Sequence, residues 1–168
     1  MGKSGVIQLF FVILHSISKD MSTFIGNINA KLDDKGRVFV PAAYRRILDE
    51  NESRRMVMRR DTDNACLIFY PEEVWNAKVE QLRQALDEWD PEDQLILMQF
   101  MADAEFIEPD AQGRILLTRK NLDNISAQQE LLFVGMLDRF AVWNPTLFAE
   151  RCVGQHDLAS RIRAKMKK

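Results

Sequence analysis

The sequence is poor in residues that bind metals or form disulfides. Its 168 residues include two cysteines, Cys66 and Cys152, and two histidines, His15 and His156. No CxxC pair occurs, and the two cysteines lie 86 positions apart. Structural zinc sites need closely spaced cysteine and histidine ligands, and a disulfide scaffold needs several cysteines. The sequence therefore excludes both, and we expect no metal and no cofactor.

The usual catalytic signatures are missing as well. The chain has no GxSxG nucleophile elbow, no GxxxxGK[ST] phosphate loop and no HExxH metalloprotease motif. The adjacent carboxylates Asp33 and Asp34 stand just before a glycine, which is typical of a turn rather than of an acid and base pair. We expect that the chain is not an enzyme.

No apolar run is long enough to cross a bilayer as a helix. The marked run at residues 6–14 falls well short of the roughly 20 residues that a membrane span needs. It is compatible with the core of a signal peptide, but residues 15–20 offer no small-x-small cleavage site. The alternative, which we favour, is an upstream extension with translation starting at Met21. Residues 1–20 are then outside the fold, and no membrane partner is expected.

The small net charge of -2 hides two blocks of opposite sign. Residues 30–60 hold nine basic and five acidic side chains, a net +4, and residues 71–93 hold two basic and eight acidic ones, a net -6. Charge acts locally, over a screening length of about 8 Å, so the total does not exclude nucleic acid as a partner. The basic block fits either a nucleic-acid contact or an ordinary solvated face.

The chain also contains an internal repeat. Residues 33–40 and 110–117 both read Asp-x-x-Gly-Arg followed by three apolar residues, 77 positions apart. Residues 67–71 and 141–145, 74 positions apart, both end a run of strand-forming residues at a proline. Two ordered matches at nearly the same spacing predict a tandem duplication.

Each Asp-x-x-Gly-Arg element predicts a turn between two strands. Asp33 and Asp110 can accept backbone hydrogen bonds in such a turn, and Gly36 and Gly113 can adopt a positive φ without a Cβ clash. We therefore expect a β-hairpin in each copy.

The rest of the first copy predicts a helix, two strands and a second helix. The first helix follows Pro41, the strands lie at residues 56–58 and 66–70, and Pro71 opens the second helix.

Two helices are expected to join the copies. The first carries an apolar stripe on an acidic surface, formed by Trp75, Val79, Leu82, Leu86 and Trp89. Asp90-Pro91 then begins a second helix through Met101 that is apolar on most sides, so we expect it to be well buried. Because this linker is structured, the two copies should share one core in an α+β fold.

The opening Phe24-Ile25-Gly26, the run from Leu32 to Pro41, and the repeated Asp-x-x-x-Arg element before a tryptophan-bearing strand resemble the MraZ family of bacterial transcriptional regulators. The resemblance runs from about Met21 to Arg151. It implies a swapped-hairpin, AbrB-like fold, in which a tandem duplication forms a small β-barrel with attached helices. Both pseudo-symmetric copies then come from one chain.

The resemblance also implies a function. It implies a cytoplasmic, nucleoid-associated protein that binds double-stranded promoter DNA and represses its own operon of cell-division and cell-wall genes. It further implies assembly into rings, octamers or dodecamers, that recognise short G-rich direct repeats. The alternative is an oligomeric protein-interaction factor in cell division or envelope assembly, acting through the acidic residues 71–93.

The resemblance implicates the arginine of each repeated element, Arg37 and Arg114, in DNA contact. A guanidinium that reaches outward from such a turn can bond to guanine O6 and N7. The other basic residues of the first copy are suited to phosphate contact, and the candidates are Lys31, Lys35, Arg45 and Arg46. Asp33 and Asp110 could hold the arginines in place or only stabilise the turns.

The second copy departs from the first in three ways. Thr118 stands where the first copy has Pro41, and Ala111 and Gln112 replace an aspartate and a lysine. Because this turn is less basic, we expect Arg37 to contribute more to DNA binding than Arg114.

We divide the chain into four segments. These are the extension (1–20), the first repeat with its acidic helix (21–93), a helix with the second repeat (94–151), and a basic tail (152–168) that we expect to be frayed and solvated.

Overall fold

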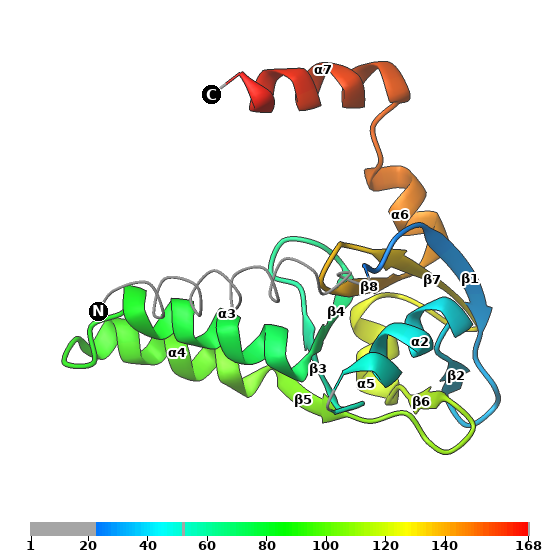
Figure 1. Ribbon diagram of the computed structural model, residues 1–168, viewed down its shortest axis with the longest axis horizontal. Coiled ribbons are helices and arrows are strands. Elements are labelled where there is room, and N and C mark those ends of the chain that lie inside the picture. Colours follow the sequence, from blue (N-terminus) through cyan, green and yellow to red (C-terminus); the bar gives the residue numbers. More distant parts are fainter. Residues whose placement is uncertain (1–22, 52, 168) are drawn as a thin grey trace, which may run out of the picture.

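The computed structural model describes residues 23–51 and 53–167, so the interpretation of residues 1–20 lies outside the described residues. The fold is α+β, as expected, with eight strands in two antiparallel sheets and six helices among these residues. Figure 1 shows the sheets at one end of the molecule, a pair of helices projecting sideways from them, and the C-terminal helix standing apart.

The two halves of the chain have the same order of elements. The first half forms β1 (Asn27–Lys31), β2 (Arg37–Phe39), α2 (Ala42–Glu50), β3 (Met56–Arg60), β4 (Cys66–Pro71) and α3 (Glu72–Ala85). After α4 (Pro91–Ala102), the second half forms β5 (Ala104–Ile107), β6 (Arg114–Leu116), α5 (Arg119–Asn124), β7 (Glu130–Gly135), β8 (Phe140–Trp143) and α6 (Pro145–Arg151). The last helix is α7 (Gln155–Met166). The strands and helices predicted for the first copy are confirmed.

The strands of the two halves are interleaved. The larger sheet has the order β1-β7-β8-β4-β3-β5, so β1 pairs with β7 of the second half and β5 pairs with β3 of the first. At its centre β4 pairs with β8, with Cys66 opposite Trp143 and Phe69 opposite Phe140. The smaller sheet consists of β2 and β6 alone. Neither half therefore completes its own sheet.

The expectation of a β-hairpin in each copy is wrong beyond the turn. In the first copy the turn forms, because the Asp33 amide donates to the Arg37 carbonyl (2.8 Å) and the Gly36 amide donates to the Asp33 carbonyl (3.0 Å). β1 then joins the larger sheet while β2 pairs with β6. The two strands diverge because Val38 and Val40 are buried in the core that the two sheets enclose.

One core contains residues from both halves, as expected. Its centre is aromatic: the rings of Phe69 and Phe140 stack with their centroids 5.0 Å apart, and Tyr44 and Phe133 lie against Phe140. A smaller apolar cluster, which includes Trp75, covers the other face of the larger sheet beneath α3 and α6. The halves are therefore joined through their interior.

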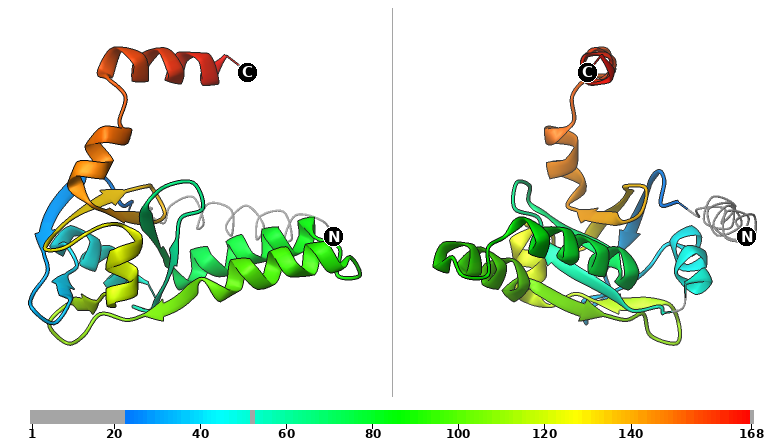
Figure 2. Two further views of the ribbon diagram at one scale, coloured as in Figure 1. Left: turned by 180° about the vertical axis from the view of Figure 1, so that it is seen from behind. Right: turned by 60° about the vertical axis from the view of Figure 1, so that its left-hand side comes forward.

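The helices α3 and α4 form a hairpin that extends beyond the sheet (Figures 1 and 2). Asp90 caps α4 by accepting the Glu92 amide at 2.8 Å, as the Asp-Pro pair predicted. Trp75 of α3 stacks on Phe100 of α4, with centroids 5.3 Å apart and an interplanar angle of 3°.

Two predictions for this hairpin are wrong. α3 ends at Ala85, so the predicted stripe does not continue through the helix to Trp89, which is 85% exposed at the tip. No residue of α4 is buried, and Met98 is 60% exposed. The reason is the shape of the molecule: α3 covers only one side of α4, and the sheet reaches only its base.

The basic tail is helical over Gln155–Met166, which corrects the expectation of a frayed segment. Alanine, arginine and lysine are good helix formers, Asp157 lies in the first turn, and Arg163 and Lys165 lie in the last. The acidic side chain lies at the positive end of the helix macrodipole and the basic side chains lie at its negative end, so both interactions stabilise the helix.

Candidate nucleic-acid interface

Asp33 uses its two carboxylate oxygens for different tasks. Oδ1 accepts the amides of Lys35 and Arg37, both at 2.9 Å, and closes the turn. Oδ2 accepts Nε of Arg37 at 2.7 Å. Gly36 has φ +78°, the left-handed conformation that glycine favours. Asp33 therefore both stabilises the turn and orients the arginine.

The second turn repeats this geometry. Oδ1 of Asp110 accepts the amides of Gln112 and Arg114 at 2.9 Å, and Oδ2 accepts Nε of Arg114 at 2.8 Å. Gly113 has φ +82°. The backbone hydrogen bond from the arginine is the largest cause that lowers the pKa of Asp33 and of Asp110 below the ordinary value. Both aspartates are thus held as carboxylates.

The strands β2 and β6 join the two turns into one ribbon. Arg37 lies opposite Leu116 and Phe39 opposite Arg114. Backbone bonds extend the pairing, because the Val40 amide donates to the Gly113 carbonyl at 3.0 Å and an equivalent bond ends at Gly36. Figure 1 shows this ribbon at the end of the molecule away from the α3–α4 hairpin.

Side chains alternate across the ribbon. Val38 and Ile115 point into the core. The opposite face carries the two arginines together with Phe39 and Leu116, which are 55% and 53% exposed. We did not single out this apolar pair from the sequence, although the alternation of residues after each Gly-Arg could have revealed it.

The two arginines differ in how firmly they are held. Arg37 contacts Asp33 through Nε, whereas both Nε and Nη2 of Arg114 lie 2.8 Å from Oδ2 of Asp110. The Arg37 side chain is 33% exposed and that of Arg114 is 21% exposed. The Arg114 guanidinium also lies 6.0 Å from the ring centre of Phe39. Arg37 is therefore the more accessible of the two.

The structure places the four candidate phosphate contacts in different settings. Lys35 is exposed in the first turn, and Lys31 lies at the end of β1, 4.0 Å from Glu130. Arg46 is exposed on α2. Arg45 reaches across to the second turn, where a Cβ on Gly113 would lie 2.6 Å from its Cδ. Of these four residues, Arg45 is the one that lies next to the turn of the other half of the chain.

Two other arginines of the basic block serve the base of the helical hairpin. Arg55 forms an ion pair with Glu72. Arg59 is buried, and its guanidinium lies 4.2 Å from the ring centre of Phe100. The basic block is therefore divided between the ribbon and a structural role elsewhere.

The described residues form neither a metal-binding cluster nor a membrane-spanning helix. Within the described ranges, 23–51 and 53–167, no cluster of three or more histidine, cysteine or acidic side chains is arranged to bind a metal ion. In the same ranges no helix is both long and apolar enough to span a bilayer.

A known protein family matches most of the chain. The family described as "MraZ protein, putative antitoxin-like" matches residues 23–98 and 100–158. The chain belongs to the MraZ family. This confirms the resemblance noted in the sequence, and the match contains both turns and the whole β2–β6 ribbon.

MraZ proteins of several bacteria are similar to this chain. The protein named "Transcriptional regulator MraZ" in Bacteroides fragilis is 43% identical over 123 residues, which cover 73% of this chain and 78% of the relative. The protein of the same name in Phocaeicola vulgatus is 35% identical over 139 residues, 83% and 90% of the two chains. That of Haemophilus influenzae is 36% identical over 121 residues, 72% and 80% of the two chains.

Proposed function

We propose that this chain is a sequence-specific DNA-binding transcriptional regulator that contacts DNA through the β2–β6 ribbon. The relatives are named transcriptional regulators, which supports the class of function. The observation that carries the site is the pair of arginines on one face of the ribbon, each oriented by an aspartate four residues earlier.

The ribbon has the shape that such a role needs. The major groove of B-DNA, about 12 Å wide, admits a two-stranded β-ribbon. An arginine whose Nε is already bound to a carboxylate keeps terminal amino groups for a base edge, and guanine offers two acceptors, O6 and N7, that match this fork. Phe39 and Leu116, beside the arginines, are suited to apolar contact with thymine methyl groups.

We propose that the fold arose from a tandem duplication of a swapped-hairpin, AbrB-like unit. Its support is the matched register of equivalent strands across the halves: β2 meets β6 about Val38 and Ile115, and β4 meets β8 with Cys66 and Phe69 opposite Trp143 and Phe140. In this proposal residues 21–93 and 94–151 are two copies of one unit and not two independent domains.

The regulatory role is also part of the proposal. The protein represses its own operon of cell-division and cell-wall genes as a cytoplasmic, nucleoid-associated ring that binds G-rich direct repeats. One ribbon makes few base contacts and the net charge is -2, so several linked ribbons on several repeats would supply the affinity.

Binding to the DNA directly upstream of the gene tests this proposal. We expect Arg37→Ala to weaken binding about 10-fold or more per repeat, as loss of a bidentate guanine contact does. Arg114→Ala should weaken it less, because Arg114 is less exposed and more firmly held by its aspartate. Anisotropy titrations against promoters with one and with several repeats measure both effects.

The matched control is Arg83→Ala, which removes an arginine of α3 that is paired with Glu80 and far from the ribbon. It should bind DNA as the wild type does. Equal losses for Arg37→Ala and Arg114→Ala would contradict the predicted order. If the wild-type oligomer is folded but does not bind the promoter DNA, the result would favour the alternative, a protein-interaction factor in cell division or envelope assembly.

A further inference from the structure

The outward side of α4 carries an apolar stripe that none of the described residues covers. Leu95, Met98 and Met101, three residues apart on successive turns, are 51%, 60% and 42% exposed. The other side of the helix faces α3, where Phe100 stacks on Trp75. Large apolar side chains gathered on one exposed helix face mark an interaction surface more often than a solvated one.

The helix α7 carries a second exposed apolar stripe. Leu158, Ile162 and Met166, four residues apart, lie along one side of the helix and are all exposed. Figures 1 and 2 show α7 standing away from both sheets and from the α3–α4 hairpin, joined to α6 by residues 152–154. A helix of 12 residues is marginally stable alone in water, so α7 gains from packing against a partner.

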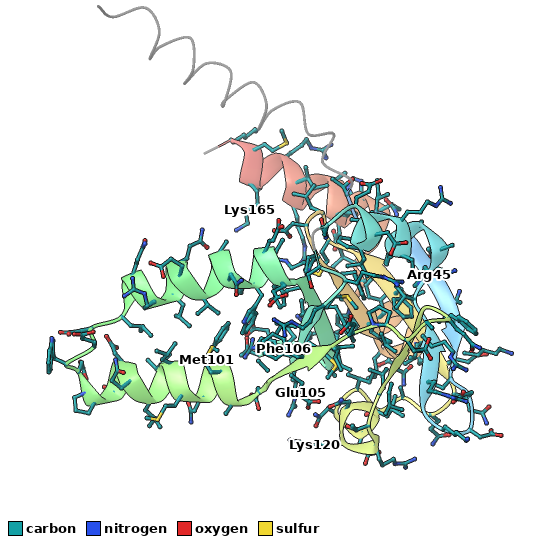
Figure 3. All side chains as sticks on the ribbon, turned by 60° about the horizontal axis from the view of Figure 1, so that its bottom comes forward. Arg45, Met101, Glu105, Phe106, Lys120 and Lys165 are labelled. Atoms are coloured by element: carbon teal, nitrogen blue, oxygen red, sulfur yellow. The ribbon has the colours of Figure 1, made fainter. Side chains whose placement is uncertain are left out.

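The two stripes are complementary in charge and length. Residues 90–105, which contain α4, hold five acidic and no basic side chains, whereas residues 155–168 hold five basic and one acidic. At about 1.5 Å of rise per residue the stripes are about 9 Å and about 12 Å long. Figure 3 shows Met101 on α4 and Lys165 on α7, on two separate projections of the molecule.

We propose that α7 of one copy packs its stripe along the α4 stripe of a second copy. The second copy is the favoured occupant because one chain carries both complementary surfaces and the structure holds them apart. The contact is head-to-tail, so each copy has one donor and one acceptor surface. Such heterologous contacts are all satisfied only when the assembly closes into a ring. This inference rests on the self-assembly in the proposed function and identifies the surfaces that produce it.

Disulfide trapping between two separately purified full-length variants tests the contact. One variant carries Met98→Cys and the other Ile162→Cys, both in a Cys152→Ser background that removes the exposed native thiol. Burial raises the pKa of the remaining Cys66 thiol to about 12, so Cys66 is unreactive. We expect a disulfide-linked dimer that forms only when both variants are mixed.

The matched control replaces Met98→Cys with Lys120→Cys on α5, which is exposed and lies on another part of the molecule (Figure 3). It should give no linked dimer with the Ile162→Cys variant. Two results would overturn the proposal: no linkage while native mass spectrometry shows an intact assembly, or linkage only within one chain when both cysteines are placed together.

Substitutions that place a charge in either stripe provide a second test of the contact. Met98→Asp and Ile162→Asp each alter an exposed side chain, so we expect circular dichroism to show a folded chain while the native mass falls toward the single copy. Ile25→Asp, which alters an exposed isoleucine outside both stripes, should leave the mass unchanged. Assembly of both stripe variants at wild-type mass would contradict the proposal.

DNA binding separates this inference from the proposed function. The stripe variants should bind a single repeat as the wild type does and lose the added affinity for several repeats. If the wild type binds no promoter DNA, the proposed function fails, whereas trapping and native mass still decide the α7–α4 contact.

Discussion

At the scale of single residues, the two turns show how one side chain can stabilise the backbone and orient an arginine at the same time. Asp33 and Asp110 satisfy backbone amides with one oxygen and fix an arginine with the other. The sequence left these two roles as alternatives, and the structure shows both. Spacing alone could not decide, because an aspartate followed by glycine and arginine fits either role.

The pH dependence of stability follows from these aspartates. Their pKa values are lowered from the ordinary 3.8, so the stabilisation is complete above that value and is lost as the pH falls through the lower native pKa. We expect the Asp33→Asn and Asp110→Asn double variant to be less stable than the wild type at neutral pH and equal to it in strong acid. Thermal unfolding from about pH 7 to about pH 2 measures this. A stability difference that does not change with pH would show that the carboxylate charge is not the cause.

Substitutions at three glycines with positive φ can separate the cost of backbone strain from the cost of steric crowding. All three would impose left-handed strain of about 1 to 2 kcal/mol when changed to alanine. At Gly26 a Cβ meets nothing within 4 Å, at Gly113 it meets the flexible end of Arg45, and at Gly36 it lies 2.7 Å from the Leu117 carbonyl oxygen. We therefore expect the loss of unfolding free energy to increase in the order Gly26→Ala, Gly113→Ala, Gly36→Ala.

Urea unfolding of the three variants measures that order, with Gly26→Ala as the control for strain alone. The double variant Gly113→Ala with Arg45→Ala should be less destabilised than the sum of the two single changes, because the clash is removed with the arginine. Strict additivity would mean that Arg45 does not crowd the second turn.

At the scale of elements, local rules were enough for turns and helix starts. The cap at Asp90 and the turns at Gly36 and Gly113 follow from residues within a few positions of each other. The environment of α4 could not be predicted in the same way. A helix that is apolar on most sides predicts burial, but the sequence does not tell whether its own chain or another surface covers it.

The base of the helical hairpin depends on Phe100, which lies between the Trp75 ring and the buried Arg59 guanidinium. We expect Phe100→Leu to reduce the unfolding free energy by about 1 to 2 kcal/mol, since it removes the ring stacking and the cation–π contact but keeps an apolar side chain. Urea denaturation measures the loss. Met101→Leu, exposed on the same helix, should change stability little and serves as the control.

At the scale of the whole molecule, the repeat was visible in the sequence but the pairing was not. Similarity between residues 33–40 and 110–117 shows that two segments are alike. It does not show whether each strand pairs within its copy or with the other, because strand pairing depends on contacts between residues far apart in the sequence. The positions of Arg37 and Arg114 on one ribbon face follow from that exchange and so could not be predicted either.

Interleaving predicts that neither half folds alone as a monomer. The fragment 21–93 lacks β7 and β8, and the fragment 94–168 lacks β3 and β4, so each loses its partners in the larger sheet. We expect each fragment to show no cooperative thermal unfolding as a monomer, and an equimolar mixture to regain the cooperative transition. Circular dichroism with mass determination measures both. Cooperative unfolding of a monomeric fragment would contradict the interleaved pairing.

The near symmetry of the ribbon is broken beside one turn. Arg45 lies against Gly113, whereas the residue 77 positions later, Leu122, is an uncharged side chain buried in the core. A fully symmetric face would lie on the duplex equally well in two opposite orientations, which suits a palindrome. Lys35 in the first turn and Arg45 against the second therefore give the two ends of the ribbon different arrangements of charge and the face a direction. Under the proposed function, each subunit would then read a site in a single polarity along the double helix.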